Sequence, residues 1–299
     1  MKNNDYNNKL PIALNLVFYI LLFSLISGCA ATMNYEPSIV RFDSPETSGE
    51  YMATDIDVSS SYTSSRRMAI VSEKGFSDAR QGSPDWVESN NGRRTTNVTL
   101  SPGLRAGIGM AKWMDIYYRT ALLDEANIVG AKLQLFGTSQ KENKAGLKVA
   151  LSMGIGYGQE DYTGSFKGQF NLSMNEVALN IGYRLDQQWI AYLNNFYSRY
   201  QLNGELGKST DSESYYLIRT PTYMVDGDSK GFGQLLGVRY EFNNQITKKT
   251  GRRQFVSLEI GRGSWGWPQV TATGYDPILN ENPDKAAWAI GVSSGFVWD

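Results

Sequence analysis

The stretch Leu147–Gly158, LKVALSMGIGYG, decides the fold because its side chains change character at every second position. Side chains of a β-strand point alternately to opposite faces of a sheet. In this stretch one face carries only large apolar residues, from Leu147 to Tyr157, and the other carries Lys148 among alanine, serine and glycine residues. The run is also longer than the strands of about 5–6 residues that are usual in soluble proteins. It therefore predicts a long strand with one broad apolar face and one narrow face.

The same alternation recurs along the chain, and no segment after residue 50 has a helical period. Clear examples are Val98–Met110, Val177–Leu185 and Trp288–Trp298, and weaker ones are Met52–Tyr62, Met114–Leu123, Ile128–Gly137, Trp189–Leu202, Phe232–Phe242 and Phe255–Gly263. The sequence thus predicts an all-β fold with about ten strands (8–12).

Two features favour a membrane barrel over a soluble one. A soluble barrel turns its apolar face inward, whereas a membrane barrel turns it toward lipid and fills its lumen with small and charged residues. The repeats have the length that a tilted strand needs to cross a bilayer, about 9–11 residues. Their non-apolar face also combines glycines with charges, as a narrow lumen requires. The predicted lumen charge network consists of Arg105, Asp115, Arg119, Lys132, Lys148, Arg184, Arg199, Arg239, Glu241 and Glu259.

The lengths of the connections agree with an antiparallel up-and-down transmembrane barrel over residues 51–299. If the first strand starts in the periplasm, odd connections face outward and even ones face inward. The predicted odd connections are Thr63–Thr96, Asp124–Asn127, Gln159–Asn175, Asn203–Gly231 and Ser264–Lys285, and the even ones are Ala111–Lys112, Thr138–Lys144, Asp186–Gln188 and Asn243–Arg253. Four of the five outward connections are long and all inward ones are shorter, as in outer-membrane barrels.

The N-terminus has the pattern of an export signal. Lys2 and Lys9 precede an apolar run, Leu10–Ile26, which ends in Ile26-Ser27-Gly28-Cys29. This end resembles the bacterial lipobox. The resemblance implies that residues 1–28 are a lipoprotein signal peptide and that Cys29 carries acyl chains such as palmitate. Ala30, in place of Asp, implies sorting to the outer membrane. A signal anchor with an incidental cysteine is the alternative. Residues 29–50 are polar, contain two prolines and are predicted to form a periplasmic tether.

Over residues 51–299 the alternating pattern and the aromatic end Phe296–Trp298 resemble the bacterial outer-membrane β-barrel superfamily, in its small OmpA-like form. Asp299 departs from that superfamily, in which the aromatic residue is usually last. Together with the lipobox, this resemblance implies a lipid-anchored protein in the outer membrane of a Gram-negative envelope. The partners implied are outer-membrane lipid, lipopolysaccharide, and the barrel assembly and lipoprotein sorting machinery.

The composition argues against several functions. The chain has no histidine, and the enzymes of this superfamily place a histidine in the active site. We therefore expect no enzymatic activity and no cofactor. One cysteine without histidine leaves no pattern for a metal site. A net charge of −1 and a pI near 5.7 argue against nucleic acid as a partner.

The leading prediction is a structural or surface-interaction role through long extracellular loops. Possible surface contacts are Tyr215, Tyr216, Tyr223, Trp265 and Trp267. The two tryptophans also fit an interfacial aromatic girdle. One alternative is a narrow channel or transporter for small or hydrophobic solutes. The other is a lipid-anchored soluble periplasmic barrel that binds a hydrophobic ligand.

Overall fold

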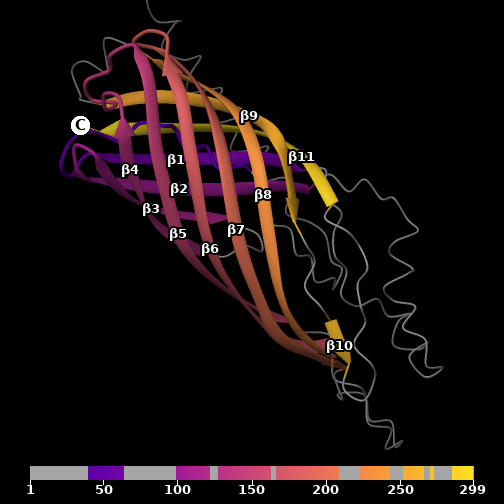
Figure 1. Cartoon of the computed structure of the whole chain (residues 1–299). Coiled ribbons are helices and arrows are strands. Elements are labelled where there is room, and N and C mark those ends of the chain that lie inside the picture. The colour runs from indigo at the N-terminus through magenta and orange to yellow at the C-terminus, as the bar shows by residue number, and fades with distance from the viewer. Residues whose placement is uncertain are drawn as a thin grey trace, which may run out of the picture. The chain divides into compact units, whose positions relative to one another are not determined.

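The computed structural model describes residues 40–63, 99–121, 127–162, 166–208, 223–242, 252–265, 270–272 and 285–298 (Figure 1). The strands are β1 (Thr54–Thr63), β2 (Thr99–Ala111), β3 (Met114–Ala121), β4 (Asn127–Phe136), β5 (Gly146–Tyr162), β6 (Phe166–Arg184), β7 (Trp189–Lys208), β8 (Tyr223–Phe242), β9 (Arg252–Trp265), β10 (Val270–Ala272) and β11 (Lys285–Trp298). Among these residues no helix has the length and apolar character needed to span a membrane.

Ten of these strands close into a barrel. Each strand from β1 to β9 pairs antiparallel with the next, β9 pairs with β11, and β11 pairs with β1 from Thr54↔Trp298 to Thr63↔Ala289. The three-residue β10 adds to the far end of β8 at Val270↔Val225 and lies outside the closed ring. The predicted all-β, up-and-down antiparallel barrel of about ten strands is confirmed.

The alternation seen in the sequence sorts side chains between two environments. Large apolar residues point away from the barrel axis and stay exposed: Ile155 is 68% exposed, Leu236 63% and Trp288 60%. The intervening small and charged residues are buried in the lumen. The barrel is therefore apolar outside and polar inside, the reverse of a soluble barrel.

Aromatic residues lie at two levels of the outer face on three of the strands. Three strands each carry an outward aromatic near both ends of the apolar region, and in each case the two are eight positions apart in the sequence. The pairs are Trp189 and Tyr197 on β7, Phe232 and Tyr240 on β8, and Trp288 and Phe296 on β11. Eight residues extend about 26 Å along a strand and less along a tilted barrel axis. This matches the scale of the apolar band of outer-membrane barrels, about 25 Å tall between aromatic girdles.

The barrel has two unlike ends. At the turn end, β1 begins, β11 stops, and the even connections join β2–β3, β4–β5, β6–β7 and β8–β9. Asp186 closes the β6–β7 turn by accepting backbone hydrogen bonds from Gln188 at 2.7 Å and Trp189 at 2.8 Å, which lower the pKa of its carboxyl. At the start of the β4–β5 turn Gly137 has a φ of +89°, and a Cβ there would lie 2.3 Å from the Leu147 carbonyl oxygen. Only glycine fits that position.

At the opposite end of the barrel, which we call the loop end, four strands extend beyond the others. The strands β5, β6, β7 and β8 have 17, 19, 20 and 20 residues, whereas the other strands of the ring have 8 to 14. Figure 1 shows these four strands extending beyond their neighbours as one wall.

Because these four strands are so long, two of the predicted connections are shorter than the sequence analysis expects. Of the predicted connection Gln159–Asn175 only residues 163–165 lie outside β5 and β6, and β7 and β8 take up both ends of Asn203–Gly231. The alternation of apolar and polar residues ends in these segments, because both faces are polar once a strand leaves the apolar band. Backbone pairing nevertheless continues to Tyr162↔Gly168 and Leu206↔Tyr223.

Candidate functional site

The most unusual feature of the structure is a chain segment inside the barrel. Residues 40–50, which we call the plug, run through the lumen before β1 begins, and every residue from Val40 to Gly49 is buried. Their partners lie on strands all around the ring. These residues form the last part of the predicted periplasmic tether, 29–50. The structure corrects that part of the assignment, because these residues are buried and their polar side chains bond to residues of the lumen wall.

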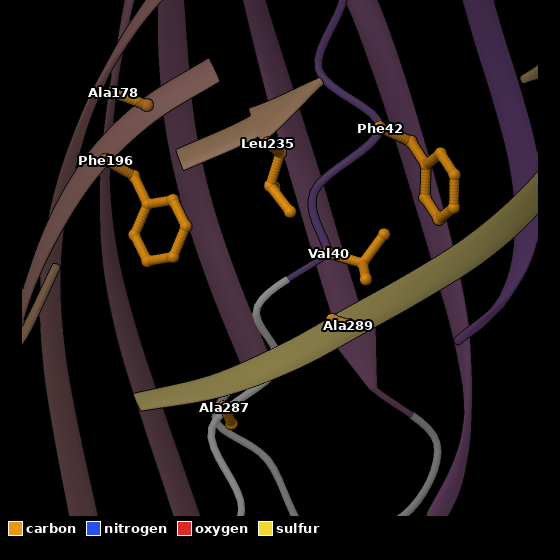
Figure 2. Packing of buried hydrophobic residues seen from close by; sticks show 7 residues of the cluster. All are labelled: Val40, Phe42, Ala178, Phe196, Leu235, Ala287 and Ala289. Carbon is orange, nitrogen blue, oxygen red and sulfur yellow. The ribbon is translucent and has the colours of Figure 1, made fainter. Parts of the chain in front are cut away.

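Apolar contacts hold the N-terminal part of the plug. Figure 2 shows the cluster that Val40 and Phe42 form with residues of β6, β7, β8 and β11, namely Ala178, Phe196, Leu235, Ala287 and Ala289. A Cβ at Gly291 of β11 would lie 2.8 Å from the Phe42 ring and 2.9 Å from Val40. The missing side chain at Gly291 therefore makes room for the plug next to β11.

Arg41 places a positive charge between three strands. Its backbone N donates to Glu259 of β9 at 2.9 Å, and its guanidinium donates to Glu176 of β6 and to Ser198 of β7. The same guanidinium lies 4.0 Å from the centre of the Phe196 ring, within the range of a cation–π interaction. A cation that is buried this deeply is stable only because it is paired and hydrogen-bonded.

Glu176 joins the plug to the opposite wall. Besides Arg41, it accepts from Arg119 of β3 at 2.7 Å and from the Tyr117 hydroxyl at 3.1 Å. One carboxylate therefore serves two guanidinium groups that come from the plug and from β3.

Asp43 is the second residue of the plug whose charge pairs with the barrel wall. Its carboxylate accepts from Ser152 of β5 and, at 2.8 Å, from Asn180 of β6, and it lies 3.7 Å from Arg105 and 3.6 Å from Lys132. Burial alone would raise the pKa of the Asp43 carboxyl. The two cations and the two hydrogen bonds outweigh burial, so the pKa is below its ordinary value and Asp43 is ionised.

Glu46 is the third residue of the plug whose charge pairs with the barrel wall, and it belongs to a buried cluster near the turn end. It accepts from Arg184 of β6 at 2.9 and 2.5 Å and lies 3.4 Å from Lys148 of β5. Arg184 also donates to Glu241 of β8 at 3.0 Å, and Glu241 lies 3.5 Å from Arg239. The cluster thus connects β5, β6, β8 and the plug.

The C-terminal part of the plug is tied to the turn end. Ser48 donates to the Asp115 carboxylate from its backbone N at 2.9 Å and from its hydroxyl at 2.7 Å. The Thr47 hydroxyl donates to the carbonyl of Lys112 in the β2–β3 turn at 2.9 Å. In the β4–β5 turn, Gln140 N donates to the Thr47 carbonyl at 2.9 Å.

The structure places nine of the ten predicted network residues on the lumen side of the wall. They are Arg105, Asp115, Arg119, Lys132, Lys148, Arg184, Arg239, Glu241 and Glu259. Eight of these nine form hydrogen bonds or ion pairs of 3.9 Å or less with the plug or with a residue that contacts the plug directly: Arg105, Asp115, Arg119, Lys132, Lys148, Arg184, Glu241 and Glu259.

Arg199 is a correction. Its side chain is 49% exposed on the outer face of β7 and pairs with Asp228 of β8 at 2.5 Å. The lumen face of β7 instead carries large residues, including Tyr192, Phe196 and Tyr200. The rule that polar residues face inward fails here, because Arg199 lies beyond the apolar band, where the outer face is itself polar.

Several partners in the network were not predicted. They are Arg41, Asp43, Glu46, Asp55, Asp57 and Glu176. Asp55 and Asp57 could have been found, because they lie on the polar face of the first alternating stretch. Glu176 could have been found too, because it shares a face with Ala178 and Asn180. The plug residues carry no such signal, since nothing local distinguishes a buried polar segment from a solvated one.

Other predicted site residues cannot be placed. Cys29, Tyr215, Tyr216 and Trp267 lie outside the described residues. Tyr223 and Trp265 are at the loop-side ends of β8 and β9. In the described ranges no group of acidic or cysteine side chains has the arrangement of a metal site.

No protein-family model matches the chain, and no curated protein matches it. Among solved structures it is similar to OmpT (in-vitro folded), an outer membrane protein of Vibrio cholerae. The identity is 11%, the TM-score is 0.16, and the match covers 82% of this chain and 96% of that one. A likeness with this TM-score supports no inference about function.

Proposed function

We propose that this chain is a non-enzymatic outer-membrane β-barrel lipoprotein whose lumen is closed by its own N-terminal segment. Its role is structural or interactive and is exerted at the loop end. The observation that carries the proposal is the plug, which fills the lumen with paired charges inside a wall that is apolar on the outside.

The outer face favours the membrane over the alternative of a soluble periplasmic barrel. Soluble monomers rarely expose a contiguous apolar patch larger than a few hundred Å². Here exposed apolar residues occur on all ten strands of the ring; β2 contributes Met110, and the other outward residues described on this strand are half-buried. Lipid is the surrounding medium in which such a belt is stable.

The lumen favours a closed barrel over the alternative of a channel. Arg41, Asp43 and Glu46 of the plug pair with wall residues at successive levels. A solute would have to break these pairs and leave buried charges without partners, which costs several kcal/mol for each charge.

The remaining parts of the proposal come from the sequence. Cys29 carries the lipid anchor, and Ala30 directs the protein to the outer membrane. The lipid matrix, lipopolysaccharide and the assembly and sorting machinery are the general partners. Tyr215, Tyr216, Tyr223, Trp265 and Trp267 belong to the loop end, where contacts with a specific partner would form.

Detergent extraction of a Cys29→Ala variant tests the membrane location. If the barrel itself spans the membrane, the variant still needs detergent for extraction and shows heat-modifiable mobility on gels. Release of the variant into buffer, with the wild type retained, would establish the soluble barrel and overturn the proposal.

Planar-bilayer recordings test the closed lumen. The wild type is expected to give no steady current. A matched pair of variants identifies the path of any current, because Arg105 lies in the lumen and Arg199 on the outer face. Steady wild-type current that changes with Arg105→Ala but not with Arg199→Ala would establish the channel instead.

A further inference from the structure

A row of polar side chains interrupts the apolar band of the outer face. Three neighbouring strands contribute one residue each, and the three are register partners: Asn195 of β7 pairs with Gln234 of β8, and Gln234 pairs with Arg262 of β9. All three point outward, and Gln234 and Arg262 are exposed. Side chains that lie opposite each other on one face of an antiparallel pair have Cβ atoms about 4.5–5.5 Å apart. These three residues, which we call the polar row, are therefore continuous across the three strands.

The polar row lies at the loop-side margin of the apolar band. Trp288 of β11, one of the loop-side aromatics of the outer face, is the register partner of Arg262. The aromatic partners Tyr197 and Phe232 lie two residues nearer the loop end on β7 and β8. Toward the turn end the next outward partners are all apolar: Leu193, Leu236, Ile260 and Ile290. The row is thus at the level of an aromatic girdle, where lipid headgroups meet acyl chains.

Within the polar row the two amides bond to each other. Gln234 Nε2 donates to Asn195 Oδ1 at 2.9 Å. The Arg262 side chain has no hydrogen bond, ion pair or ring contact with the part of the chain that the structure describes. Arg252, an outward arginine at the other end of β9, differs, because its guanidinium lies 5.8 Å from the centre of the Trp298 ring. Arg262 therefore presents its donors beside an amide pair at the margin of the apolar band.

We propose that the polar row is a binding site for a lipid whose headgroup is anionic and carries phosphate. The planar guanidinium of Arg262 donates two parallel hydrogen bonds to phosphate oxygens. The NH2 group of Asn195 donates a further one. The inference rests on the proposed function, because only an outer face in contact with lipid meets such a headgroup.

The surroundings of the polar row fit the two parts of such a lipid. On β8 Phe232 covers the row from the loop end, whereas on β9 the next outward residue is the small, polar Ser264. The headgroup reaches Arg262 past Ser264. The acyl chains then lie along the exposed apolar side chains of Leu236 and Ile260, which follow toward the turn end.

The charges near the polar row favour a lipid anion over a second copy of the chain. Lys230, four residues nearer the loop end on the outer face of β8 (234 − 230), adds another exposed positive charge. Asp228 is acidic and lies on the same face, but it is already bonded to Arg199. A symmetric contact between two copies would bring the two Arg262 side chains together, which like charges disfavour.

Quenching of tryptophan fluorescence by brominated lipid tests this inference, because Trp288 lies directly beside Arg262. The full chain is reconstituted in phosphatidylcholine vesicles that contain a minor fraction of phosphatidic acid, and bromine is carried by either lipid in turn. The difference between wild type and Trp288→Phe isolates the signal of Trp288. Flotation with the vesicles and heat-modifiable mobility show that each variant is folded and inserted.

The expected result is an enrichment of phosphatidic acid beside Trp288 of roughly five-fold over its bulk fraction, the factor that one basic residue contributes at an anionic lipid surface. Arg262→Gln should abolish this enrichment, and Asn195→Leu/Gln234→Leu should reduce it. Arg252→Gln is the matched control, because it removes an outward arginine of the same strand beside Trp298 at the turn end, and it should leave the enrichment unchanged.

Other outcomes overturn the inference. Enrichment that is absent from the wild type, or that survives Arg262→Gln, shows that no lipid site exists at the row. Enrichment that is undiminished in Asn195→Leu/Gln234→Leu shows that the guanidinium acts alone. Equal quenching by both lipids, with dimers in detergent that Arg262→Gln dissociates, makes the row an interface between copies. A wild-type chain that does not float with the vesicles contradicts the membrane location of the proposed function itself, and the lipid site fails with it.

Discussion

Arg184 donates hydrogen bonds from Nε and Nη2 to the two carboxylate oxygens of Glu46, at 2.9 and 2.5 Å, across 138 positions of sequence. Both side chains are almost completely buried. A bidentate guanidinium–carboxylate pair of this kind fixes orientation as well as distance. It fastens the plug to β6 near the turn end, and through Glu241 the same guanidinium reaches β8.

Removal of one partner of this pair should lower the stability of the folded barrel. Arg184→Met leaves Glu46 buried with only Lys148 nearby, and we expect it to lower the free energy of unfolding by about 3–5 kcal/mol. Guanidinium unfolding followed by heat-modifiable mobility measures the loss. The double variant Arg184→Met/Glu46→Met should recover part of it, because neither charge is then unpaired. Strictly additive losses would show that the two residues are not coupled.

Two arginines provide a matched comparison between lumen and surface. Arg105→Ala leaves Asp43 and Asp55 short of a cation inside the barrel and should cost more than about 3 kcal/mol of unfolding free energy. Arg199→Ala removes an exposed ion pair with Asp228 and should lower the unfolding free energy far less, because water screens an exposed pair. Equal losses in the same unfolding assay would contradict the placement of Arg199 on the outer face.

A disulfide should trap the plug in its place. The variant Val40→Cys/Gly291→Cys puts two thiols where a Cβ at residue 291 would lie 2.9 Å from the residue 40 side chain. Oxidation is expected to form the bond in the folded barrel and to change gel mobility without reductant. Neither single variant should show this change. Failure of the folded double variant to oxidise would place residue 40 elsewhere.

The Asp43 carboxyl should make stability depend on pH in the acid range. Its pKa in the folded protein is below the ordinary 3.8, so its contribution is complete above the ordinary value and is lost as pH falls through the folded pKa. The difference in unfolding free energy between wild type and Asp43→Asn should therefore shrink as pH is lowered below about 4. A difference that stays constant to pH 2 or grows would contradict the ionised state of Asp43.

A charged residue in the apolar band of the outer face should destabilise the barrel. Leu236→Arg places a guanidinium on the outer face of β8 inside the band, where the expected cost is about 2–4 kcal/mol in a bilayer. Gln234→Arg, two residues nearer the loop end on the same face, is the control and should cost less. Unfolding in lipid vesicles measures both. If Leu236→Arg proves neutral, the outer face is not in contact with lipid.

Local pattern was enough to predict the wall of the barrel. In Leu147–Gly158 the polarity changes at every position, so the strand, its two faces and the inward direction of Lys148 all follow from neighbouring residues. Arg199 shows the limit of this reasoning. It points outward because it shares a face of β7 with Tyr197. A charge is tolerated on that face because β7 extends beyond the apolar band, and pairing with β6 and β8 sets this extension.

Residues 40–50 show what only the tertiary structure decided. Taken alone, the segment is short, polar and rich in charge, which is equally compatible with a solvated tether. Its burial depends on partners that lie far away in the chain: Glu259 is 218 positions from Arg41, Glu176 is 135, and Arg184 is 138 from Glu46. Alternation between neighbouring residues therefore determined the barrel, because strand geometry is local. The closed ring determined the plug, because only the ring brings enough opposite charges around one segment to replace water.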